Sequence, residues 1–208
     1  MAEKVVGYAL TTKNRIKDRL QLTTAQHDVL LDRLVSTATD YIEAECSRRF
    51  KSTPYANEVY SVYGERQEFV LLKQAPVTAL TSAQYRAGTP SNPSWTGYTA
   101  DEFELAEDGK SGIVKIYGRA PKGTNTLRFS YTAGYLIDFD NVGDTTKHTL
   151  PLDLSDLTER LAVKLFKKRD AEGKATESYE GGSVTWNELL DEVDRQILAR
   201  YRRLPTFV

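Results

Sequence analysis

The sequence is poor in the groups from which disulfides, metal sites and membrane anchors are built. Its 208 residues include one cysteine and two histidines, so no intrachain disulfide can form and no histidine–cysteine metal cluster is indicated. No apolar run approaches the roughly 20 residues that cross a bilayer, so we expect no membrane association. The formal net charge is −1, which provides no general positive field for nucleic acid. We expect a protein made and used in a reducing cytoplasm, or in something assembled there.

What the chain does contain is hydrophobic periodicity, and its first fifty residues predict an αα-hairpin. A short helix is expected over residues 13–20. The clearest periodic run covers residues 24–50, where Thr23 and Gln26 fit a capping box at the start. Its apolar residues recur at three- and four-residue steps and form one stripe: Leu30, Leu31, Leu34, Val35, Ala38, Tyr41, Ile42 and Cys46.

Residues 51–150 have the alternating pattern of β-strands. Valine and tyrosine alternate with polar residues over 57–64, and a similar alternation recurs over 126–135. Asp108 and Gly109 supply the turn of a hairpin between two further strands. Residues 89–97 contain two prolines and predict a loop. Six or so short strands of this kind predict an antiparallel sandwich or barrel-like region.

Two more helices are predicted after this β-rich region. The first covers residues 157–173, and the polar stretch 174–183 that follows predicts a flexible loop. The last helix covers residues 185–204, with Thr185 and Glu188 as its capping box. Its apolar stripe has near-heptad spacing and comprises Trp186, Leu190, Val193, Ile197, Tyr201 and Leu204.

The order of these elements predicts an α+β fold. We expect a four-helix α bundle, made of two N-terminal and two C-terminal helices, with an inserted antiparallel β-sandwich or barrel-like region. The helical bundle would comprise residues 1–50 and 151–208, and the inserted β-rich subdomain residues 51–150. The long helix is the natural partner against which the other three helices bury their stripes.

The sequence has no motif of a catalytic, metal or cofactor site. His27 and His148 stand outside any cluster of ligands, and Cys46 lies on the apolar stripe, so structural roles are expected for all three. Residues 138–143 are acidic, but they lack the ligands that complete a calcium loop and predict a polar turn. Because P-loop, GxGxxG and nucleophile-elbow motifs are missing as well, we expect neither an enzyme nor a bound cofactor.

Charge is distributed unevenly along the last helix. Acidic residues come first and arginines last, an order that matches the helix dipole. The same arginines, with the apolar residues that follow them, can instead form a basic tip that docks into another protein or approaches a polyanion. Both interpretations fit the sequence. The candidate docking residues are Trp186, Arg195, Arg200, Tyr201, Arg202, Arg203, Leu204, Phe207 and Val208.

Four segments occur in an order typical of one protein family. They are ATDYIEAECSRRF (residues 38–50), LKQAPVTALTS (72–82), SYTAGY (130–135) and LTERLAV (157–163). In this combination the chain resembles the head–tail connector proteins of tailed bacteriophages, also called adaptor or head-completion proteins, in a longer variant with a β-insertion. The resemblance covers about residues 10–169.

The resemblance implies a structural virion protein and not an enzyme. Connector proteins of this family form a ring, here expected to be a dodecamer, beneath the portal of a DNA-filled head. The ring extends the DNA channel, through which genomic DNA passes without sequence-specific binding, and it carries the tail-side completion or terminator protein. Because C-terminal segments of the family reach the portal, the candidate docking residues would bind the portal protein. The implied location is the head–tail interface of the virion, and the host cytoplasm during assembly.

Two other functions fit the sequence. A tail-completion or tail-terminator-type virion protein would differ from a connector only in its partner. A small hydrolase or carbohydrate-binding module would use aromatic residues of the β-rich region, Tyr85, Trp95 and Tyr98, as a platform. Alternating tyrosines on strands are more often core or interface residues, which favours the virion functions.

Overall fold

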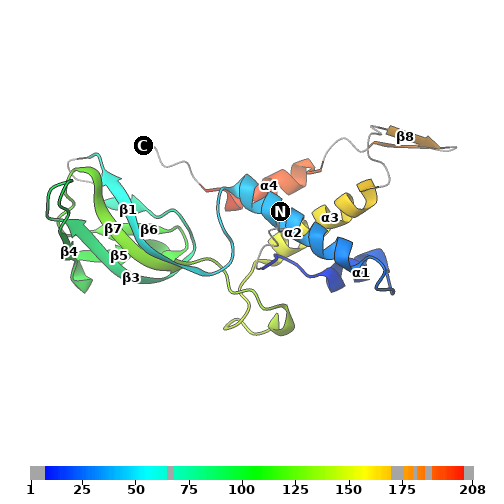
Figure 1. Ribbon diagram of the computed structural model, residues 1–208, viewed down its shortest axis with the longest axis horizontal. Helices are drawn as coiled ribbons and strands as arrows, with labels where there is room; N and C mark the ends of the chain where they lie inside the picture. Colours follow the sequence, from blue (N-terminus) through cyan, green and yellow to red (C-terminus); the bar gives the residue numbers. More distant parts are fainter. Residues whose placement is uncertain (1–7, 65–67, 170–175, 180–181, 186–188, 204–208) are drawn as a thin grey trace. The chain divides into compact units, whose positions relative to one another are not determined.

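A computed structural model describes residues 8–64, 68–169, 176–179, 182–185 and 189–203 (Figure 1). The chain divides into two compact units. The helical unit comprises Met1–Arg48 and Ile137–Arg202, and the β unit comprises Arg49–Leu136 and Arg203–Val208. The Arg49–Leu136 part of the β unit is therefore inserted between two parts of the helical unit.

The helical unit contains four α-helices: α1 (Lys13–Leu20), α2 (Asp28–Cys46), α3 (Leu152–Lys168) and α4 (Glu192–Tyr201). The hydroxyl of Thr12 caps α1 by accepting a hydrogen bond from the Arg15 amide. The long helix α2 begins later than the sequence pattern indicated, after His27, whose side chain makes no capping hydrogen bond. The capping box predicted at Thr23 was therefore wrong. The helix ends where Ser47 adopts the left-handed conformation, with a φ of 52°.

The core of the helical unit lies between α2 and α3, and both α1 and α4 pack against this pair. The predicted stripe of α2 is confirmed in its centre, whereas its flanking members Leu30, Leu34 and Tyr41 are only half-buried. Long apolar side chains in the interior supply most of the stabilisation of such a core, because each removes its surface from water. The fully buried ones are Leu10, Ile16, Leu31, Ile42, Leu154, Leu157 and Leu161.

The β unit contains two antiparallel sheets around one apolar core. The larger sheet has the strand order β1-β7-β3-β4 and consists of Thr53–Val62, Gly123–Ala133, Val77–Arg86 and Trp95–Gly97. The smaller sheet has the order β2-β6-β5 and consists of Phe69–Leu71, Ile113–Ile116 and Phe103–Leu105. Side chains from both sheets form the core, including Tyr60, Val70, Val114, Leu127, Phe129 and Tyr131. Neither sheet closes into a barrel within the described residues.

The two ends of the β unit lie next to each other. β1 and β7 pair antiparallel at Thr53 and Ala133, and just outside these strands Lys51 and Tyr135 form an isolated parallel bridge. The Tyr135 amide donates to the Phe50 carbonyl at 2.6 Å. The chain therefore enters and leaves this unit along adjacent backbone segments.

Three segments differ from the sequence-based prediction. The proline-containing loop 89–97 ends in the short strand β4. Within and just after the stretch predicted as a flexible loop, the described residues form two short strands that pair antiparallel, β8 (Thr176–Tyr179) and β9 (Gly182–Thr185). Because Thr185 belongs to β9, it cannot cap the last helix, which begins at Glu192 instead.

Candidate docking site on the C-terminal helix

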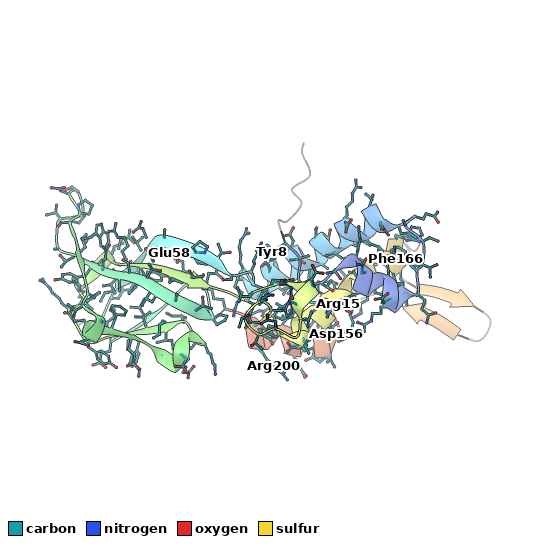
Figure 2. The ribbon with its side chains drawn as sticks, turned by 90° about the horizontal axis from the view of Figure 1, so that it is seen from below. Tyr8, Arg15, Glu58, Asp156, Phe166 and Arg200 are labelled. Carbon is teal, nitrogen blue, oxygen red and sulfur yellow. The ribbon has the colours of Figure 1, made fainter. Side chains whose placement is uncertain are left out.

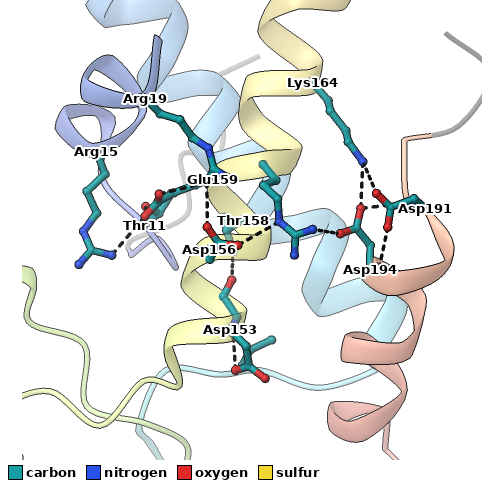
Figure 3. A network of polar contacts seen from close by, with 12 residues as sticks. Thr11, Arg15, Arg19, Asp153, Asp156, Thr158, Glu159, Lys164, Asp191 and Asp194 are labelled. Atoms are coloured by element: carbon teal, nitrogen blue, oxygen red, sulfur yellow. Dashed lines mark hydrogen bonds and ion pairs between the residues drawn. The ribbon is translucent and has the colours of Figure 1, made fainter. Parts of the chain in front are cut away.

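A buried carboxylate anchors α4 to α3 (Figure 3). The side chain of Asp194 is 1% exposed and pairs with Arg160 at 2.6 Å and with Lys164 at 2.9 Å. Asp194 also forms a capping box with Asp191, in which each carboxylate accepts a hydrogen bond from the backbone amide of the other residue. One side chain thus both starts the helix and attaches it to α3.

The charges in this cluster stabilise one another. The backbone amide of Asp194 and the ammonium of Lys164 lower the pKa of Asp191. Partial burial acts to lower the pKa of Lys164, but its hydrogen bonds and charge interactions with Asp194 and Asp191 outweigh this effect and raise it. Both groups are therefore held in their charged forms at neutral pH.

The anchor rotates α4 away from the orientation that its apolar stripe predicts. Asp194 and Leu198 are buried, whereas Val193 is 60% exposed and Ile197 is half-buried. The prediction that Val193 belongs to the buried stripe was therefore wrong. The physical reason is that pairing Asp194 with two cations turns the helix so that the face one residue further along meets the core.

Further contacts hold the C-terminal half of α4. The Leu198 carbonyl lies 3.8 Å from the thiol of Cys46, whose pKa burial raises to about 11. The hydroxyl of Tyr201 donates to Asp153 at 2.7 Å. Arg202 pairs with the carboxylate of Glu45 at 3.1 Å. The predicted docking residues Tyr201 and Arg202 are thus used, at least in part, to attach α4 to its own unit.

A hollow of 610 Å³ lies between α2 and α4. Its wall combines apolar side chains with three cations, Lys168, Arg195 and Arg202, and one carboxylate, Glu45; the remaining lining residues are Tyr41, Leu189, Leu190, Leu198 and Ala199. Two of the predicted docking residues, Arg195 and Arg202, therefore come together at this hollow.

The other predicted docking residues do not join them there. Arg200 is exposed on α4 and Arg203 is half-buried. Val193, Ile197 and Arg200 recur at four- and three-residue steps on α4, and we call this set the α4 stripe. Trp186, Leu204, Phe207 and Val208 lie outside the described residues.

A second polar network joins α1 to α3 (Figure 3). Glu159 pairs with Arg15 at 3.2 Å, and Asp156 pairs with Arg19 at 2.8 Å. Beside these pairs is a hollow of 330 Å³, the acidic hollow, which is lined by Arg15, Asp18, Leu152, Asp156 and Glu159. Sequence reasoning missed this hollow, because its residues come from two helices that are more than 130 positions apart in the sequence, and each helix alone has the ordinary pattern of a solvated face.

The histidines have structural roles. The ring nitrogen Nδ1 of the buried His148 accepts a hydrogen bond from the Asp138 amide at 3.1 Å, which organises the turn that contains residues 138–143. His27 packs edge-on against Phe166, with ring centroids 5.4 Å apart. No group of three or more metal-ligating side chains occurs among the residues that the structure describes.

The aromatic residues considered as a glycan platform do not lie together. Tyr85 and Tyr98 pack against the core of the β unit, with ring centroids 5.2 Å apart. Trp95 pairs with Arg86, the neighbour of Tyr85, and so lies on the opposite face of the sheet. There the guanidinium of Arg128 covers its ring at 4.4 Å. A single platform made from these three residues is therefore wrong.

Comparison with known proteins gives a match at the level of fold. Neither a protein-family model nor a curated protein matches this sequence. Two chains from solved structures align with a TM-score of 0.58 and 18% identity, over 99% of this chain and 95% of theirs. They come from the neck of an empty gene transfer agent particle computed with C6 symmetry and from the virion of a native gene transfer agent particle. A third, from the neck of a native particle computed with C12 symmetry, has a TM-score of 0.54 at the same identity and coverage.

The likeness therefore concerns the fold of nearly the whole chain. It extends over both units and is not limited to the helices. Among the described residues, moreover, no helix combines the length and the apolar composition needed to cross a bilayer.

Proposed function

We propose that this chain is a structural protein of the neck of a tailed, phage-like particle, and specifically a head–tail connector (adaptor) subunit. Copies would form a ring beneath the portal, extend the DNA channel and provide the platform on which the tail assembles. The observation that carries the proposal is the match in fold over 99% of the chain to proteins found in such necks.

Ring formation is supported by the symmetry of the similar structures. Two of them belong to necks computed with C6 and C12 symmetry. A ring needs two different surfaces on each subunit, so that a head-to-tail contact repeats around the axis. A dodecamer is the copy number that we propose. A net charge of −1 agrees with a channel through which DNA slides, because strong positive charge would retain the phosphate backbone.

The portal-docking role is proposed for α4 and the residues around it. Arg195, Arg200, Arg202 and Arg203 place four cations within nine residues. The hollow between α2 and α4 offers an apolar wall with three cations, a combination that suits an acidic segment of a partner protein. Trp186 and residues 204–208, which lie outside the described residues, remain part of the proposed docking set.

A tail-completion or tail-terminator protein is the second candidate. The same fold evidence favours it, since both kinds of protein occupy the neck, where the similar structures are found. The two candidates differ in the partner that binds first, the portal or the tail tube.

The experiment is to measure the mass of the purified protein and to image it by negative stain, alone and mixed with the portal protein of the same particle. We expect a ring of added mass on the portal. Removal of residues 195–208 should abolish this docking. A protein that binds the tail tube and not the portal would favour the second candidate. A protein that binds neither and stays monomeric would refute both.

A further inference from the structure

The acidic hollow presents an apolar group beside an unpaired charge. The ion pairs described above neutralise Asp156 and Glu159. Asp18 is exposed and has no ion-pair partner in the part of the chain that the structure describes. Leu152, which lines the same hollow, keeps 66% of its surface exposed. The hollow therefore offers an apolar contact next to a negative charge, which suits a partner with an apolar group and a cation.

The α4 stripe has the complementary composition. Val193 and Ile197 are its apolar part. Arg200, which is labelled in Figure 2, is its charge. Within the described ranges the side chain of Arg200 makes neither a hydrogen bond nor an ion pair. Val193 and Arg200 are seven residues apart, or about 10 Å along the helix axis. A span of that length can place Val193 over an aliphatic side chain while Arg200 reaches a nearby carboxylate.

We propose that the α4 stripe of one copy docks into the acidic hollow of a second copy of this chain. Arg200 pairs with Asp18 across the interface, while Val193 and Ile197 cover Leu152. Of the candidate portal-docking residues, Arg200 is thereby assigned to the contact between copies. The proposal rests on the proposed function, which requires contacts between neighbouring copies. It names the two surfaces that make those contacts in the helical unit.

The occupant is a second copy because the two surfaces belong to different sides of one unit. α1 and α4 both pack on α3, and Figure 3 shows them on opposite sides of it. The α4 stripe therefore cannot reach the acidic hollow of the same molecule, but it can reach the acidic hollow of another copy. Such a head-to-tail contact uses different surfaces on the two partners and repeats in every copy, which is the arrangement that generates a ring. The opposite charges of Arg200 and Asp18 fix the direction of the contact.

The first test is cross-linking between two variants of the full chain. Asp18→Cys and Arg200→Cys proteins are mixed and treated with a short bismaleimide. Cys46 does not interfere, because it is buried. The matched control replaces Asp18→Cys by Lys167→Cys, an exposed position on α3 that lies 15 residues from Leu152, about 22 Å along the helix.

We expect the Asp18–Arg200 mixture to give about ten times more heterodimer than the control mixture, and more than either variant alone. The contact is captured irreversibly, so weak association is also detected. Equal yields from the matched and control pairs would overturn the proposal. If rings are seen by mass under the same conditions without selective cross-linking, the proposed function stands and only this interface is wrong.

A charge exchange gives the second test. Asp18→Arg or Arg200→Asp alone places like charges opposite each other and should weaken self-association about tenfold, which corresponds to about 1.4 kcal/mol. The double variant restores opposite charges in exchanged positions, so association should return to within a few-fold of the original. Sedimentation equilibrium measures all four proteins. A double variant as weak as the single ones would contradict the pairing.

Discussion

Replacing Asp194 with Asn tests whether the buried carboxylate anchors α4. Removing one partner of a buried ion pair costs about 3–5 kcal/mol when the other charge stays buried. Here the side chains of Arg160 and Lys164 remain 24% and 36% exposed and can recover water, so we expect a cost at or below the lower end of that range. We expect the free energy of unfolding to fall by about 2–3 kcal/mol.

The assay combines urea denaturation with hydrogen exchange at the amides of α4. We expect the exchange of α4 to accelerate more than that of α2, because α4 would detach before the core opens. Glu192→Gln serves as the control, since that side chain is exposed on the same turn and should change stability by less than about 0.5 kcal/mol. If Asp194→Asn behaves like this control, the anchoring role of the ion pairs is wrong.

Three further predictions concern both units. The lowered pKa of Asp191 adds stability that is present above pH 3.8, the ordinary pKa of an aspartate, and is lost as the pH falls below that value. The urea midpoint of the original protein should therefore drop below pH 3.8, and the midpoint of Asp191→Asn should drop less. Gly109→Ala should destabilise the β unit by more than about 1 kcal/mol in thermal denaturation, because the φ of Gly109 is +81° and a Cβ would lie 2.0 Å from the Val77 carbonyl oxygen. Gly97→Ala is the control, because a Cβ at Gly97 would meet no other atom within 4 Å. Leu157→Ala, at a fully buried position of α3, should lower the urea stability by about 2–5 kcal/mol, and an unchanged midpoint would contradict the assigned core.

The elements that the sequence predicted well are those with strong periodicity. α1, the centre of α2, strand β7 and the hairpin of β5 and β6 follow directly from residue patterns in which one face of each element is apolar. The start of α2 was misplaced because Thr23 is a residue type that often caps helices, whereas the residue at the N-cap position of α2 is His27. Strand β4 was missed because three residues are too few to show a period.

The candidate docking site shows a second limit. A stripe of apolar residues predicts the buried face of a helix only when the opposite face carries nothing that must also be buried. In α4 the buried face is set by the carboxylate of Asp194 and not by Val193, because Asp194 forms ion pairs with two cations on α3. Those cations are 30 and 34 positions away in the sequence, and no local pattern reveals that they face α4.

The adjacent ends of the β unit have a consequence for how such a chain can change. Because residues 50–53 run beside residues 133–135, a short linker could replace the whole unit and rejoin α2 to the segment before α3. The inserted segment begins and ends at one place in the chain of the helical unit. Its length and surface can vary without moving the helices, so one scaffold can accept different neighbours through exchange of a single module.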